Sequence, residues 1–181
     1  TTGPPKGVTF DHAQLRWMGE CIAGLMPWAA RNRATVYLSF LPLNHVVEGI
    51  LATYAPYYLP APVDIYFLED IYTVAQVLPR VRPTFFFSVP RVYEKVWEGL
   101  QSNWLGRIYL GLQHGLLQRA LRPLLRWRLL RKAGFDRCAQ LIAGSAAVSE
   151  GLLRGFHELG IEIYNAYGLT EAPLVTLNRA G

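Results

Sequence analysis

Hydrophobic and polar positions follow two alternating patterns along the chain. Short runs rich in β-branched and aromatic residues predict buried strands. Longer stretches with apolar residues at helical spacing separate these runs and predict helices. The predicted strands are residues 35–41, 63–67, 84–89, 138–143 and 161–166. The predicted helices are residues 47–59, 71–81, 90–132 with interruptions near Gly106, Gly111, Gly115 and Pro123, and 149–159, between Ser149 and Gly160.

This order of elements predicts an α/β fold in which a parallel sheet is covered by helices. Ligands of such sheets bind at the carboxyl ends of the strands. The loops at those ends are therefore the places to look for chemistry. We also expect a strand before Thr1, because the opening Thr-Thr-Gly loop has the character of a loop that follows one.

Two segments carry groups that suit a nucleotide. Residues 1–8 (Thr-Thr-Gly-Pro-Pro-Lys-Gly-Val) combine hydroxyls, glycine N–H groups and a lysine, which are the parts that hold phosphate. The Walker pattern is absent, and a Pro-Gly surface turn is the alternative. Residues 164–171 (Tyr-Asn-Ala-Tyr-Gly-Leu-Thr-Glu) offer an aromatic face for a purine, a hydroxyl for a phosphate and a carboxylate for magnesium. The alternative is a strand end with a polar turn.

Two further segments lie at predicted strand ends. The small residues of 143–147 (Ala-Gly-Ser-Ala-Ala) would let a flat ring lie against the backbone, or would serve tight helix–strand packing. Residues 41–48 (Leu-Pro-Leu-Asn-His-Val-Val-Glu) place His45 where a site is expected, although a histidine can equally be a structural hydrogen-bonding group.

Together these segments resemble the adenylate-forming superfamily of acyl-CoA synthetases, luciferases and peptide-synthetase adenylation domains. Residues 167–171 match its Tyr-Gly-x-Thr-Glu motif, and residues 1–8 resemble the end of its Pro-Lys-Gly phosphate loop. Residues 144–147 are similar to its Gly-Ala-Ala-Pro stretch, with Ala147 in the place of proline, and residues 41–45 to its Leu-Pro-x-x-His segment. Ser88-Val-Pro-Arg-Val-Tyr-Glu-Lys-Val96 resembles the Val-Pro-Arg-x-x-Glu-Lys signature of the long-chain fatty acyl-CoA synthetases.

The resemblance implies ATP-dependent activation of a long-chain fatty acid to an acyl-adenylate and then to acyl-CoA, with magnesium as cofactor and coenzyme A as co-substrate. It implies that His45, Thr170 and Glu171 are catalytic and that Glu171 takes the metal. The implied nucleotide-binding residues are Thr1, Thr2, Gly3, Lys6, Gly144, Ser145, Ala146, Ala147, Asn165, Tyr167, Gly168 and Thr170.

The resemblance also implies that residues 1–181 are part of the large N-terminal domain of such an enzyme. The family's ribose-binding aspartate, hinge, mobile C-terminal domain and adenylation lysine would lie beyond Gly181, and the first residues of the phosphate loop before Thr1. We therefore expect an internal fragment, inactive alone, whose partners include the missing parts of its own chain.

Charge is unevenly distributed. The net charge is +5, yet residues 99–135 contain no Asp or Glu. Basic residues and tryptophans on an amphipathic helix suit an anionic membrane surface. The alternatives are a solvated basic face, or one paired with acidic surface elsewhere in the parent protein. A nucleic-acid partner is not expected, because no aromatic-basic strand motif occurs.

The composition limits the class of protein and the compartment that can be expected. The chain is 51% hydrophobic, which suits one globular core, and no apolar run is long enough for a membrane span. Cys21 and Cys138 lie far apart, outside any metal-binding spacing, and are expected to be reduced thiols of a cytoplasmic protein with peripheral contact at the inner face of the membrane. An aryl- or amino-acid-activating domain is the alternative enzyme. A non-catalytic nucleotide- or membrane-binding module is the alternative of another class.

Overall fold

The fold is built on parallel strands, as the sequence predicts. The computed structural model describes residues 7–25, 33–112 and 115–178. The strands are β1 (Thr35–Ser39), β2 (Val63–Phe67), β3 (Phe85–Ser88), β4 (Gln140–Ala143), β5 (Ile163–Tyr167) and β6 (Thr176–Leu177). β1 pairs in parallel with β2, and β3, β4 and β5 form a second parallel set. The short β6 runs antiparallel to β5 and was not predicted.

Thr84 joins the two sheets. Its N–H donates to the carbonyl of Val36 (2.9 Å), and its Oγ1 accepts from the N–H of Val36 (2.9 Å). β1 therefore lies beside β3, and the strands follow the spatial order β2, β1, β3, β4, β5, β6. This order carries every carboxyl end of the parallel strands to one edge of the sheet.

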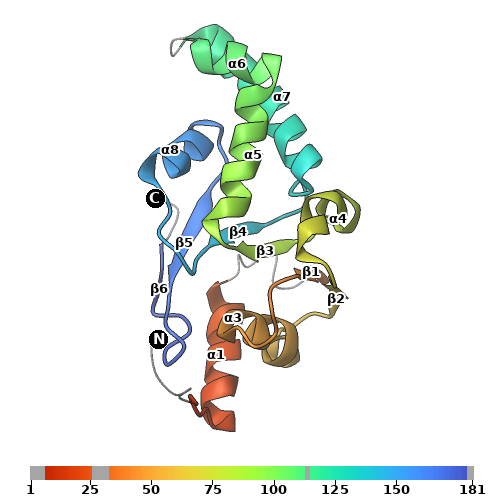
Figure 1. Cartoon of the computed structure of the whole chain (residues 1–181), viewed down its shortest axis with the longest axis vertical. Coiled ribbons are helices and arrows are strands. Elements are labelled where there is room, and N and C mark those ends of the chain that lie inside the picture. The colour runs from red at the N-terminus through yellow and green to blue at the C-terminus, as the bar shows by residue number, and fades with distance from the viewer. Residues whose placement is uncertain (1–6, 26–32, 113–114, 179–181) are drawn as a thin grey trace.

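Helices connect the strands and cover both faces (Figure 1). They are α1 (His12–Leu25), α3 (Val46–Gly49), α4 (Val74–Val81), α5 (Pro90–Ser102), α6 (Trp104–Gly111), α7 (Leu116–Ala133) and α8 (Glu150–Glu158). Irregular helical turns are η1 (Ile50–Tyr54), η2 (Ala55–Tyr58) and η3 (Ile71–Thr73). Within the described part of the chain, no helix combines the length and apolar character needed to cross a membrane.

Several element boundaries differ from the predictions. Helix α1 was not predicted, and the helix predicted over 47–59 is the succession of α3, the π-helical η1 and the 3₁₀ turn η2. The interruption predicted near Gly106 falls at Asn103, between α5 and α6. Gly106 itself lies inside α6, where a Cβ atom would be 2.0 Å from the carbonyl oxygen of Leu100. A glycine is needed there because α6 packs closely on the end of α5.

The long helical region is divided at other positions. α5 ends before Asn103, whose side chain caps α6 by accepting from the N–H of Leu105 (3.0 Å). The interruption predicted at Pro123 is wrong, since α7 continues through this residue while Leu125 and Leu129 anchor the helix in the core. The break between Gly111 and Gly115 is confirmed, as is the cap of α8 by Ser149, which accepts from the N–H of Leu152 (3.3 Å).

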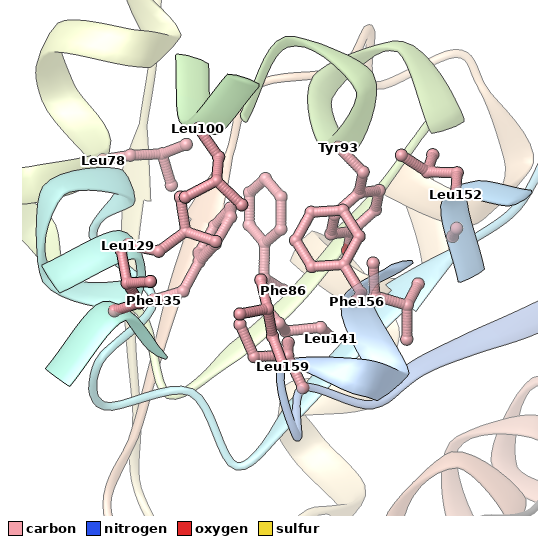
Figure 2. Close-up of a cluster of buried hydrophobic side chains, with 14 of the residues drawn as sticks. Leu78, Phe86, Tyr93, Leu100, Leu129, Phe135, Leu141, Leu152, Phe156 and Leu159 are labelled. Atoms are coloured by element: carbon pink, nitrogen blue, oxygen red, sulfur yellow. The ribbon is translucent and has the colours of Figure 1, made fainter. Parts of the chain in front are cut away.

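Successive residues of the central strands face opposite sides of the sheet. On one side, Phe86 is fully buried among α5, α7 and α8 and contacts the rings of Tyr93 and Phe135, with centroids 6.2 and 4.8 Å away (Figure 2). On the other side, Phe85 and Phe87 form a separate cluster with residues of β1, β4 and η1. The second face is the one that the functional cavity uses.

Candidate functional site

A cavity of about 720 Å³ lies on the Phe85 and Phe87 face of the sheet. Most of its wall is apolar. The apolar lining residues include Trp17, Met18, Ile22, Val46, Val47, Ile50, Leu51, Phe85, Phe87 and Ile142. Helix α1 thus forms one wall, α3 and η1 a second, and the strands the floor. A cavity of this size and lining can hold an apolar molecule together with polar groups at its edge.

Polar groups reach this cavity from three loops. His45 follows β1, Ser145 follows β4, and the segment from Tyr167 to Glu171 begins at the last residue of β5. These segments are far apart in the sequence, and they meet because the parallel strands end at the same edge. Of the residues that the sequence singles out, His45, Ser145, Tyr167, Gly168, Thr170 and Glu171 all line this one cavity.

A tight turn presents Thr170 and Glu171 to the cavity. The N–H of Leu169 donates to the carbonyl of Ala172 (2.8 Å), and the N–H of Ala172 donates back to Leu169 (3.2 Å). Below the turn, the N–H of Val175 donates to Tyr167 (2.9 Å) and closes the β5–β6 hairpin. Thr170 and Glu171 are exposed and line the cavity, so a ligand there can reach them.

Ser145 adopts an uncommon backbone conformation at the cavity. Its φ is +64°, in the left-handed region that non-glycine residues seldom enter. Such strain occurs often at functional sites. The N–H of the preceding Gly144 donates to the carbonyl of Ser88 (3.0 Å), which ties the loop to β3. The loop thus holds Ser145 in place at the rim.

The remaining predicted site residues lie elsewhere. Gly144, Ala146, Ala147 and Asn165 are not among the residues that line the cavity. Asn165 pairs through its backbone with Asn178, whose N–H donates to the Asn165 carbonyl (3.2 Å). The predicted phosphate-holding residues Thr1, Thr2, Gly3 and Lys6 lie outside the described residues.

His45 stands at the start of α3. Its N–H donates to the carbonyl of Pro42 (2.8 Å), and its own carbonyl accepts from Gly49 (2.9 Å). One turn further, the carboxylate of Glu48 is completely buried (0% exposed) and accepts from the hydroxyl of Tyr37 on β1 (2.9 Å). Burial raises the pKa of Glu48, although the bond from Tyr37 opposes this, and burial also raises the pKa of Tyr37. This hydrogen-bonded pair holds α3 against the sheet, and so positions His45 at the start of that helix.

Sequence reasoning missed Gln140 and the α1 wall. Gln140 is a buried residue of β4 that lines the cavity, and its Nε2 donates to the carbonyl of Leu25 (3.4 Å). Its Oε1 is buried without a hydrogen-bond partner among the described residues. A glutamine within the otherwise apolar run Ala139–Ala143 is the signal that could have drawn notice, because a buried polar group needs a partner.

The segment with the fatty acyl-CoA synthetase signature serves the fold instead of lining the cavity. Pro90 is the first residue of α5, and Tyr93 is buried in the core, where its hydroxyl donates to the carbonyl of Ile142 (2.8 Å). Arg91 forms exposed ion pairs with Glu94 (2.9 Å) and Glu98 (3.2 Å). None of the residues 88–96 lines the cavity.

Glu171 fits the magnesium ion that the motif implies. It is the only acidic residue among those lining the cavity, and no group of three or more His, Cys, Asp or Glu side chains gathers within the described ranges. Magnesium is commonly held by one or two carboxylates together with substrate phosphates and water. A single carboxylate beside a hydroxyl is consistent with that arrangement.

Comparison with known proteins identifies the family. The family described as AMP-binding enzyme matches residues 1–180. The chain is 32% identical to the long-chain-fatty-acid–CoA ligase ACSBG2 of Gallus gallus, over 95% of this chain and 26% of that protein. It is 30% identical to the long-chain-fatty-acid–CoA ligase FadD15 of Mycobacterium bovis, over 94% of this chain and 31% of that protein.

A solved structure shows the same fold. The A-PCP didomain of carboxylic acid reductase from Segniliparus rugosus, in complex with AMP, superposes with a TM-score of 0.68 at 24% identity, over 98% of this chain and 24% of that one. The chain thus spans about a quarter to a third of the length of these proteins. The match over nearly every residue, with the motif residues gathered at one cavity, shows that the chain belongs to the AMP-binding, adenylate-forming enzyme family.

Proposed function

We propose that this chain, within a longer protein, contributes to the ATP-dependent activation of a long-chain fatty acid to acyl-CoA. The observation that carries the proposal is the cavity, whose wall is mostly apolar and whose rim carries polar residues from the loops at the strand ends. An aliphatic tail suits the wall, and a carboxylate and a triphosphate suit the polar rim. The named fatty-acid–CoA ligase relatives support this substrate class.

The reaction has two steps. A carboxylate oxygen attacks the α-phosphorus of ATP, the bond to the bridging oxygen of the β-phosphate breaks, and pyrophosphate leaves. The sulfur of coenzyme A then attacks the acyl carbon, AMP leaves, and a thioester forms as the thiol proton is released. The difficulty of the first step is charge repulsion, because an anion attacks a polyanion.

The rim residues address this difficulty in distinct ways. Thr170 would donate a hydrogen bond to an α-phosphate oxygen, and Glu171 would hold magnesium, which would supply charge neutralisation. Tyr167 offers its ring to the adenine, with Ser145 beside it. His45 borders the carboxylate at the entrance to the apolar part of the cavity.

The test is carboxylate-dependent exchange of labelled pyrophosphate into ATP by the intact protein, with acetate, octanoate, palmitate and an aromatic acid. We expect exchange that rises with chain length. Exchange with the aromatic acid alone would replace the substrate class by that of an aryl-activating enzyme. A folded protein that binds ATP but exchanges with none of the acids would be a non-catalytic nucleotide-binding module, contrary to the proposal.

A further inference from the structure

The outward face of α7 is apolar although it faces solvent. Leu116 is 86% exposed and Trp127 is 54% exposed, and Leu117 and Leu124 are also exposed. We call these four residues the α7 surface. Positions 116 and 127 are close to three helical turns apart, and positions 117 and 124 close to two, so all four lie within about 100° of the helix circumference. The opposite side carries Leu125 and Leu129, which are buried in the core.

Basic side chains flank the α7 surface. Arg119, Arg128 and Lys132 are exposed and form no ion pair within the part of the chain that the structure describes. Arg131 lies over the ring of Trp127, with its guanidinium carbon 5.9 Å from the ring centroid. No acidic residue occurs between positions 99 and 135. Asp136, just past this stretch, pairs with Arg131 (3.8 Å) and with none of Arg119, Arg128 and Lys132.

Two other arginines of α7 have a different role. Arg126 donates to the carbonyl of Gly160 (3.0 Å), and Arg122 to that of His157 (3.5 Å). These bonds fix α7 against the end of α8, so its outward side is held in a defined orientation. The neighbouring helix α6 adds the exposed Trp104 and Ile108, and Figure 1 shows α6 and α7 extending away from the strands.

We propose that the α7 surface docks on an anionic lipid bilayer, with its leucines and Trp127 entering the interface and the basic side chains meeting the headgroups. Apolar side chains flanked by arginine and lysine are the combination that binds such a surface. Charge complementarity selects an anionic bilayer over a neutral one.

Docking in this way leaves the cavity free. α7 packs on the Phe86 face of the sheet, whereas the cavity is lined from the Phe85 and Phe87 face. None of the residues of the α7 surface lines the cavity. Membrane binding and adenylation therefore use separate side chains and can be tested separately.

The experiment is cosedimentation of the intact protein with phosphatidylcholine vesicles, with and without phosphatidylserine, at low and high salt. The variants are Leu116→Glu and Arg128→Gln. The matched controls are Tyr72→Glu, an aromatic residue 91% exposed on η3, and Arg33→Gln, an exposed arginine outside the basic stretch.

We expect binding that requires phosphatidylserine and is weakened by salt. Arg128→Gln should lower the partition coefficient about fivefold, and Leu116→Glu roughly tenfold, with both controls unchanged. Equal binding of all variants, or no binding to the anionic vesicles, would overturn the proposal. So would variants that bind vesicles normally but melt at lower temperature without them, because other parts of the protein would then cover this surface.

Discussion

At the scale of single residues, Glu171 and Glu48 differ in burial, and this difference gives them different roles. Glu171 is exposed on a turn at the rim, where a cation and phosphates can reach it. Glu48 is fully buried and bonded to Tyr37. Burial penalises a charged carboxylate, so Glu48 acts within the fold, by joining α3 to β1, while Glu171 is placed for a ligand.

Replacement of Glu171 by glutamine should reduce pyrophosphate exchange by about 10²–10³-fold, the range found when one group that stabilises the charged transition state is removed. The amide keeps the shape but is a poor magnesium ligand, so the magnesium concentration needed for half-maximal exchange should rise. Exchange rates of the intact protein, titrated with magnesium, measure both effects. Glu69→Gln, an exposed carboxylate that does not line the cavity, is the control. An unchanged magnesium requirement would exclude Glu171 as a metal ligand.

Replacement of Glu48 by glutamine should alter how stability depends on pH. Burial raises the pKa of Glu48 above its ordinary value of 4.5, so the folded state binds this proton more tightly than the unfolded state. The associated stabilisation is complete below pH 4.5 and is lost as the pH rises through the folded-state pKa. Glutamine does not ionise, so the variant does not lose stability in this way as the pH rises. The free energy of unfolding of the variant minus that of the wild type should therefore increase with pH.

Denaturant titrations from below pH 4.5 to neutral pH, on both proteins, measure this difference. The Glu69→Gln variant serves again as control, since it makes the same chemical change at an exposed position. A difference between wild type and Glu48→Gln that stays constant with pH would contradict the prediction.

At the scale of elements, the β5–β6 hairpin is the part of the site most dependent on backbone geometry. Its turn is closed by the reciprocal bonds between Leu169 and Ala172. The chain passes close to itself at Gly168, where a Cβ atom would lie 2.1 Å from the carbonyl oxygen of Pro173. The glycine is therefore required for the turn that presents Thr170 and Glu171.

The substitution Gly168→Ala should displace this turn, because the opposing atom belongs to the backbone and cannot rotate away. We expect pyrophosphate exchange to fall at least roughly tenfold, since a shift of about 1 Å at a reacting group can cost a hundredfold. Gly151→Ala is the matched control: no atom lies within 4 Å of the added Cβ on α8, so activity should be retained. Full activity of the Gly168→Ala protein would show that the turn tolerates a methyl group.

At the scale of the whole molecule, the alternation of strand residues assigns separate tasks to the two faces of the sheet. Phe86 anchors the face that packs against α5, α7 and α8, and its neighbours Phe85 and Phe87 belong to the face that carries the cavity. The packing of helices on the Phe86 face therefore stabilises the fold, while the opposite face carries the cavity.

Phe86→Ala should lower the free energy of unfolding by about 3–5 kcal/mol, because it removes a fully buried ring from the centre of the core. Tyr72→Ala should change it by less than about 0.5 kcal/mol, since that ring is exposed. Denaturant unfolding followed by tryptophan fluorescence, which reports on Trp97 beside Phe156, measures both. A small effect of Phe86→Ala would mean that the cluster repacks around the gap.

Part of this organisation could be predicted from the sequence. Strand runs such as 84–89 are apolar and β-branched or aromatic, and Ser149 and Gly160 mark the two ends of a helix. Helix α1 was missed because Gly19 and Gly24 weaken its helical signal. Gly19 packs against the ring of Tyr58 on η2, where a Cβ atom would be only 2.5 Å away. This contact appears only in the folded chain.

The sequence by itself determined the parallel α/β class and the loops that carry His45, Ser145 and Glu171, because local patterns report strands, turns and strand ends. Only the tertiary structure decided that α1 forms a wall of the cavity and that Gln140 lines it. It also decided that the 88–96 signature lies away from the cavity, with Tyr93 buried in the core. Which face a helix covers, and which side chains meet across a sheet, depends on packing between distant segments. A local pattern contains no information about that packing.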